Sequence, residues 1–187
     1  MPLQSYPFSE YYGWIQDKYG LSWQLNLAKI PQRISPAFMF ANEQFGKAKE
    51  AMEFWMSMLP KSYIVEEVVS EGHIQQALFT LSEKSFRVMD SELAHDFDFT
   101  MAFSICIDCE DQAEIDFLWE KLTKDGKEGP CGWAEDVYGL SWQITPAKWN
   151  ELADDQNLER AAAVMQALYG MKKIEIDRLE EVYHQFD

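Results

Sequence analysis

The chain has 187 residues, and 47% of them are hydrophobic, which is enough apolar mass for a buried core and excludes a disordered chain. Its 32 acidic residues outnumber its 16 basic residues and give a net charge of −16, so we expect no binding to nucleic acid or to anionic membrane surfaces. The N-terminus lacks the pattern of a signal peptide, no run approaches the roughly 20 apolar residues of a membrane span, and three cysteines suit a reducing compartment, so a cytoplasmic protein is predicted.

The N-terminal segment contains one copy of an internal repeat. Residues 13–29 recur as residues 132–148, with 11 of 17 positions identical at a spacing of 119. Each copy reads as a strand, a turn at Asp-x-Tyr-Gly, and a second strand in which Trp and Gln alternate with apolar neighbours. The repeat therefore predicts two similar β-hairpins.

The first half of the region between the copies predicts a strand, a helix and three strands. Residues 34–40 form a buried-strand pattern, and apolar residues fall at helical spacing from 43 to 59, where Pro60 ends the helix. Further strands are predicted at residues 63–70, 74–81 and 85–89.

The second half repeats this order. Residues 99–107 are predicted as a strand, residues 108–111 as the N-cap region of a helix with Ile115, Leu118, Trp119 and Leu122 on one face, and residues 132–145 as the closing hairpin. The pattern alone gives an α+β protein with two curved sheet halves. After Lys148, Asp154 or Asp155 is predicted to cap a helix that ends at Gly170, and another amphipathic helix begins at about Asp177.

Several strings in this order resemble the PhnB-like branch, also labelled 3-demethylubiquinone-9 3-methyltransferase-like, of the vicinal-oxygen-chelate (glyoxalase/bleomycin resistance/dioxygenase) superfamily. The strings are Lys49-Glu-Ala-Met-Glu-Phe-Trp55, Cys109-Glu-Asp-Gln-Ala-Glu-Ile-Asp116, Leu118-Trp-Glu-Lys-Leu122, Cys131-Gly-Trp133, Asp136-Val-Tyr-Gly-Leu-Ser-Trp-Gln143, Val164-Met-Gln-Ala167 and Met171-Lys-Lys-Ile174.

The resemblance implies paired βαβββ units that enclose a cavity, and a homodimer. It divides the chain into residues 1–30, a partial repeat similar to the closing hairpin of a second module; residues 31–150, the module itself; and residues 151–187, a C-terminal helical extension. Two interpretations of the N-terminal hairpin stay open: part of a tandem protein that lost its front or whose start was chosen too late, or an extra hairpin that docks on an edge.

The residues at the metal-ligand positions of the family do not suit a metal ion. Metal-using relatives place His or Glu on the first strand of each half and Glu near the end of the closing strand, whereas residues 33–41 contain no His, Asp or Glu. Only Asp98 lies at the edge of the second such strand, and Gln143 stands at the closing position, as does Gln24 in the partial copy. The sequence therefore predicts no metal and no cofactor.

Other chemistry has little support in the sequence. Cys106 and Cys109 form a C-x2-C pair, but zinc requires four ligands, and residues three apart on a strand point to opposite faces. No local motif marks a Cys-His nucleophile pair, although none excludes it. Methyl transfer from S-adenosylmethionine is not expected, because the chain lacks a Gly-rich turn after its first strand and a long alternating β/α pattern.

What remains is a cavity that could take a small molecule. Its candidate ligand-binding residues are Gln143, Gln75 and His73 as polar groups, with Trp133, Met39 and Phe103 as apolar walls. Ordinary packing explains each of these residues as well, and Gln75 and Gln76 are not distinguished. Three hypotheses follow: a metal-free ligand-binding module, a metal-dependent lyase, isomerase or dioxygenase, and a structural or assembly protein.

Overall fold

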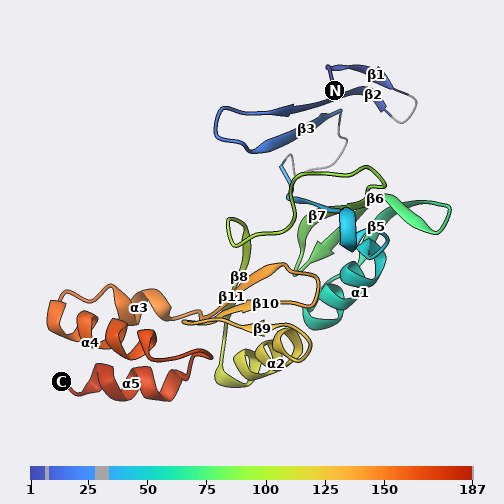
Figure 1. The fold of residues 1–187 in the computed structure, drawn as a ribbon. Helices are drawn as coiled ribbons and strands as arrows, with labels where there is room; N and C mark the ends of the chain where they lie inside the picture. The colour runs from blue at the N-terminus through green and yellow to red at the C-terminus, as the bar shows by residue number, and fades with distance from the viewer. Residues whose placement is uncertain (7–8, 28–33, 187) are drawn as a thin grey trace. The chain divides into compact units, whose positions relative to one another are not determined.

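The computed structural model describes residues 1–6, 9–27 and 34–186 and divides the chain into two compact units, Met1–Pro36 and Ala37–Asp187 (Figure 1). Three of the sequence predictions fall outside the described residues: the Ala28-Lys29 end of the repeat, the boundary between residues 30 and 31, and Arg33. Within the described part, no helix combines the length and the apolar character required to cross a bilayer.

The N-terminal unit is a three-stranded antiparallel sheet. Strands β1 (Gln4–Tyr6), β2 (Ser9–Gln16) and β3 (Ser22–Asn26) lie in the order β1-β2-β3, and the turn between β2 and β3 carries Asp17 and Gly20. Gly20 has a φ of 88°, a conformation that favours glycine. The predicted N-terminal hairpin is present as β2 and β3.

The second unit is built from two halves of the same layout. The first half consists of β4 (Ala37–Phe40), the 3-10 turn η1 (Asn42–Gln44), α1 (Ala48–Met58), β5 (Ile64–Ser70), β6 (His73–Leu81) and β7 (Lys84–Asp90). The second half consists of β8 (Ser104–Cys109), α2 (Gln112–Thr123), β9 (Lys127–Glu128), β10 (Trp133–Glu135) and β11 (Ser141–Pro146).

Each half forms one four-stranded mixed sheet. The strand orders are β4-β7-β6-β5 and β8-β11-β10-β9, and in both sheets the last strand of the half returns to lie parallel to the first. The remaining neighbours are antiparallel. This is the βαβββ arrangement twice, as the resemblance implies, and the α+β fold with paired βαβββ units is confirmed.

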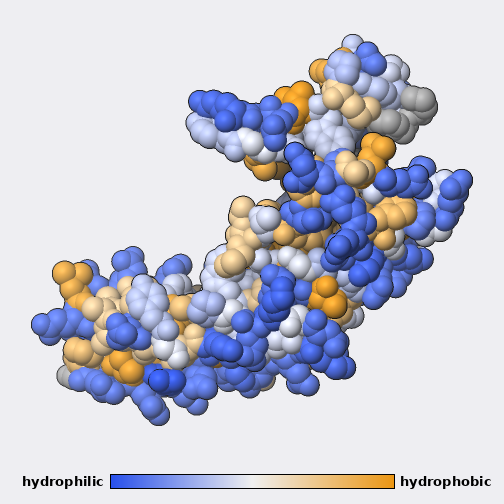
Figure 2. Space-filling model, in the orientation of Figure 1, coloured by the Kyte–Doolittle hydropathy of each residue, from blue (hydrophilic) through white to orange (hydrophobic). Residues whose placement is uncertain are grey.

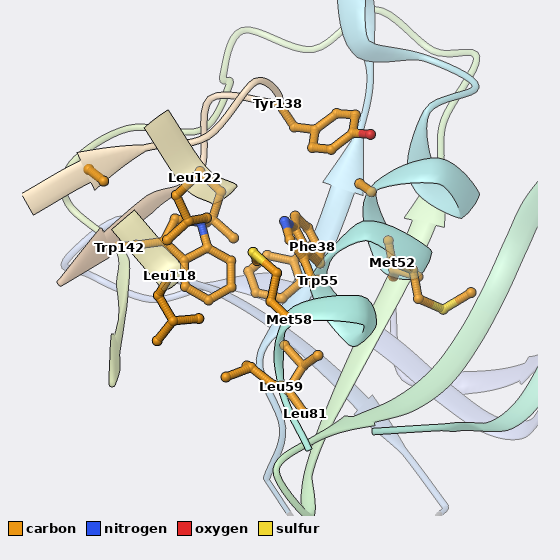
Figure 3. Packing of buried hydrophobic residues seen from close by; sticks show 14 of the residues in the cluster. Phe38, Met52, Trp55, Met58, Leu59, Leu81, Leu118, Leu122, Tyr138 and Trp142 are labelled. Atoms are coloured by element: carbon orange, nitrogen blue, oxygen red, sulfur yellow. The ribbon is translucent and has the colours of Figure 1, made fainter. Parts of the chain in front are cut away.

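One hydrophobic core joins the two halves. Helix α1 contributes Met52 and Trp55, helix α2 contributes Leu118 and Leu122, and the indole of Trp142 on β11 lies between them (Figure 3). The Trp55 and Trp142 rings meet edge to face with centroids 6.3 Å apart. Because the helical stripes predicted from residues 48–59 and 115–122 both enter this core, the two halves fold as one body.

The Asp136 carboxylate is the polar centre of this core. It is 2% exposed, and its Oδ1 accepts the backbone N–H groups of Tyr138 and Leu140 at 2.9 and 3.0 Å. Its Oδ2 accepts the indole N–H groups of Trp55 at 2.8 Å and Trp142 at 2.9 Å. Burial raises the pKa of the Asp136 carboxyl above its usual range, and these four hydrogen bonds oppose the rise.

The C-terminal extension packs on the second half through a smaller core. Helices α3 (Trp149–Ala153), α4 (Leu158–Tyr169) and α5 (Ile176–His184) bury Leu152, Val164 and Leu179 against one another. Backbone N–H groups of Cys131 and Gly132 donate to the carbonyls of Met171 and Lys172, and the side chain of Gln112 bonds to the backbone of Ile174 and Ile176. The extension is therefore continuous with the module.

Several predicted boundaries were wrong, each for an identifiable reason. Helix α1 begins at Ala48 rather than at residue 43, because Gly46 has a φ of 84° and the Asp90 carboxylate accepts the N–H groups of Gly46 and Ala48. The strand predicted at residues 99–107 is shifted to Ser104–Cys109, where parallel pairing with β11 begins, while the side chains of Phe99 and Phe103 pack on Phe38.

The cap of helix α4 is also different from the prediction. Asn157, not Asp154 or Asp155, caps the helix by accepting the N–H groups of Glu159 and Arg160. The Asp155 carboxylate instead accepts the Tyr183 hydroxyl at 2.7 Å. Helix α3 was not predicted. Asp111 does cap α2, through the N–H of Glu114 at 2.9 Å, and this prediction is confirmed.

We predict that Asp136→Asn destabilises the second unit by about 2–4 kcal/mol, because an amide nitrogen would face one of the pairs of N–H donors that the carboxylate now satisfies. Denaturant unfolding followed by circular dichroism measures the change. Asp17→Asn is the matched control, because Asp17 lies in the corresponding turn of the N-terminal unit, and the unfolding midpoint of the second unit should stay unchanged. Equal effects of the two substitutions would contradict this account of the core.

Candidate functional site

The second sheet has one buried face and one face that is open to solvent. Alternation along β10 and β11 sends Ala134, Trp142 and Ile144 into the core. Trp133 and Gln143, which are direct cross-strand partners, point to the other side and are partly exposed. We call this other side the polar face.

The parallel pairing of β8 with β11 adds two residues to the polar face. Cys106 is the register partner of Gln143, and Ser104 lies two residues before it on the same side. The Gln143 side-chain amide donates to the Ser104 hydroxyl at 2.7 Å. An amide, a hydroxyl, a thiol and an indole thus lie on one face, and together they can hydrogen-bond a small polar compound and stack against a planar one.

Two carboxylates also lie on the polar face, and both have partners. Glu135 pairs with Lys127 at 2.5 Å, and Asp108 accepts the hydroxyl of Thr145 at 3.3 Å.

The first sheet has a corresponding face with Met39 on β4 and Met89 on β7 as register partners. Arg87 lies on the same side two residues earlier, and its guanidinium is 3.7 Å from the Glu66 carboxylate. Alternation along β6 places Gln76 and Leu78 on this side, whereas Gln75 points to the other. Gln76 and not Gln75 therefore shares a face with Met39.

His73 and Gln75 lie together around a hollow of about 310 Å³ at the turn between β5 and β6. The hollow is also lined by Glu71, Asp90 and Glu92. The His73 ring lies on Phe45, with centroids 4.4 Å apart, and its Nδ1 is buried with no hydrogen-bond partner among the described residues. Asp90 is occupied by three backbone N–H groups, those of Gly46, Ala48 and Ile74.

The six predicted ligand-binding residues therefore form separate groups. Gln143 and Trp133 share the polar face, Met39 lies on the face of the first sheet that carries Met89 and Arg87, and His73 and Gln75 line the hollow. Phe103 packs edge to face on Phe38 at 5.6 Å. Sequence reasoning missed Ser104 and Arg87 and considered Cys106 only as half of a C-x2-C pair. These residues become neighbours of the candidates only through sheet register, which a single sequence does not define.

The donor set on these faces suits a neutral ligand better than a divalent ion. Among the residues that the structure describes, no group of three or more His, Cys, Asp and Glu side chains is placed to hold a metal ion. Gln143 and Ser104 are neutral oxygen ligands, and Cys106 is a single thiol.

The two cysteines of the C-x2-C pair differ strongly in their environments. Cys106 is exposed on the polar face and Cys109 is buried at the end of β8, as the spacing of three residues on a strand predicts. Burial, reinforced by Glu114, Asp108 and Asp111, raises the pKa of the Cys109 thiol to about 12. The pair is therefore no zinc half-site.

A βαβββ unit that occurs twice around one core defines the vicinal-oxygen-chelate, or glyoxalase-like, class of proteins. The chain belongs to the 3-demethylubiquinone-9 3-methyltransferase family, whose model matches residues 32–145.

One solved structure supports this assignment, and two more distant ones are similar to parts of the chain. A PhnB protein from Bacillus cereus is 36% identical, and the alignment covers 62% of this chain and 100% of that one with a TM-score of 0.57. Protein PA1353 from Pseudomonas aeruginosa is 14% identical over 60% of this chain and 97% of its own, with a TM-score of 0.48. The fosfomycin resistance protein FosX from Listeria monocytogenes is 9% identical over 65% and 97%, with a TM-score of 0.46. No curated protein matches the chain.

We predict that a thiol reagent modifies Cys106 at least about tenfold faster than Cys109 in the folded protein, because the thiolate is the reactive species and Cys109 is buried with a raised pKa. Alkylation with iodoacetamide followed by peptide mass spectrometry measures both rates. Unfolding in denaturant should bring the two rates together. Equal rates in the native protein would contradict the placement of Cys109.

Proposed function

We propose that the module is a metal-free binder of a small, uncharged, partly aromatic compound, and that the polar face of the second sheet is its binding surface. The observation that carries this proposal is the Gln143–Ser104 hydrogen bond beside Trp133 and Cys106. Gln143 stands where metal-using relatives have a carboxylate, so the group that would hold a metal ion there is replaced by one that hydrogen-bonds neutral ligands.

Methyl transfer from S-adenosylmethionine has no support in these residues. A dinucleotide-type site requires a Gly-rich turn between the first strand and a helix in a doubly wound parallel sheet. Here β4 leads into the turn Asn42–Gln44, and each four-stranded sheet contains a single parallel pair. The family description is therefore a label of relationship, and we propose no transferase activity. A homodimer, which the resemblance implies, remains a prediction.

The metal-free part of this proposal is tested directly. Protein purified without chelators should contain much less than one divalent ion per chain by elemental analysis, and titration calorimetry with Mn²⁺ should show no stoichiometric binding. We expect the same for Gln143→Glu, because the other carboxylates of the polar face, Glu135 and Asp108, already pair with Lys127 and Thr145. Cys106→Ser is the control for adventitious binding of soft metals. A stoichiometric ion that Gln143→Ala removes would overturn the proposal and favour a metal-dependent lyase, isomerase or dioxygenase.

Ligand binding at the polar face is tested with simple probes. Benzamide, nicotinamide and benzyl alcohol combine a ring with one hydrogen-bonding group, and saturation-transfer NMR detects their weak binding. We expect Gln143→Ala and Trp133→Ala to weaken binding about fivefold or more, because each removes a hydrogen bond or a stacking surface. Gln166→Ala, an exposed change on α4, should leave binding unchanged. Binding that survives both polar-face substitutions would place the ligand elsewhere.

A further inference from the structure

The two copies of the repeat form the same hairpin with the same hydrogen bonds. In the N-terminal unit Trp14 pairs with Gln24 and Ile15 with Trp23, and 119 residues later Trp133 pairs with Gln143 and Ala134 with Trp142. Asp17 accepts the N–H groups of Tyr19, Leu21 and the Trp23 indole, as Asp136 accepts those of Tyr138, Leu140 and Trp142.

The copies differ in what covers their apolar face. Trp142 and Ile144 are each 0% exposed, whereas their counterparts Trp23 and Leu25 are 39% and 43% exposed. The aromatic residue of the turn changes from 5% exposed at Tyr138 to 83% at Tyr19. Ile15, opposite Trp23, is 51% exposed. Hydrophobic residues, coloured orange, are visible on the surface of the N-terminal unit in Figure 2. We call Tyr11, Ile15, Trp23 and Leu25 the bare face of the N-terminal unit.

The second unit shows which elements cover this face when it is buried. Strand β8 pairs in parallel with β11 along its outer edge, and helix α2 lies against β10 and β11 with Ile115, Leu118, Trp119 and Leu122 turned inward. Trp55 of α1 adds the second indole donor to Asp136. Among the described residues, β3 pairs only with β2, and the Asp17 carboxylate has a single indole donor.

We propose that the bare face is a docking surface for a strand–helix segment of another polypeptide chain, whose strand pairs in parallel with β3 and whose amphipathic helix covers Trp23 and Leu25. Apolar surface that is exposed to water is unfavourable, so a segment that covers the bare face would stabilise the unit that receives it. The proposal is independent of the ligand-binding function.

The probe is a fluorescently labelled peptide of residues 102–125, which contains β8 and α2 of this chain, added to the full-length protein in reducing buffer. We expect saturable binding in fluorescence anisotropy and slower hydrogen exchange at the amides of residues 22–26. Leu25→Asp should weaken binding about tenfold or more, because it places a charge on the apolar face. Ser22→Asp is the matched control: it lies on the same strand, is exposed, and points to the opposite side, so binding should be unchanged.

Other outcomes would overturn the proposal. If Leu25→Asp does not alter binding, the peptide has replaced the β8–α2 segment of the second unit and has not docked on the bare face. No binding would exclude a strand–helix occupant. If the protein instead self-associates in sedimentation velocity, and Leu25→Asp abolishes this without any peptide binding, a second copy of the chain covers the bare face.

Discussion

The second unit depends on one buried carboxylate. Asp136 lies in the turn of the closing hairpin, yet one of its four hydrogen bonds comes from Trp55, which is 81 residues away in the other half. A buried charge of this kind is tolerated only where its acceptor positions are filled, so the turn, helix α1 and the Trp142 indole must all be in place together. The same group therefore fixes the hairpin and couples the two βαβββ halves.

This coupling decides which sheet faces remain available for a ligand. Because Trp142 and Ile144 are drawn toward Trp55 and α2, their neighbours in sequence, Gln143 and Thr145, must point away from the core. The open faces then carry the chemistry that alternate positions provide, which is Gln143, Ser104, Cys106 and Trp133 on one sheet and Met39, Met89 and Arg87 on the other. The neutral donors of the second sheet follow from residue identity, and their exposure follows from the way the core is packed.

The sequence predicted the elements much better than the site. Periodicity identified the buried stripes of α1 and α2 and the strands between them, because hydrophobic spacing directly reflects burial. It did not predict that β8 starts at Ser104, since that start is set by parallel pairing with a strand 37 residues later. For the same reason the sequence did not predict that Gln143 and Ser104 are partners, or which of Gln75 and Gln76 points to the face of Met39. Both depend on the register between strands, which no local pattern contains.

The repeat shows how far a local sequence can define its own structure. Asp17 and Asp136 receive the same two backbone hydrogen bonds and the same indole bond, so the turn and its hairpin form wherever the motif occurs. The pKa of Asp17 is nevertheless lowered, chiefly by the Trp23 hydrogen bond, whereas burial raises the pKa of Asp136. The pKa values of the two equivalent aspartates thus shift in opposite directions, because one copy is covered by a strand and helices and the other is exposed. The motif specifies a hairpin, and only a covering strand and helix convert that hairpin into part of a core.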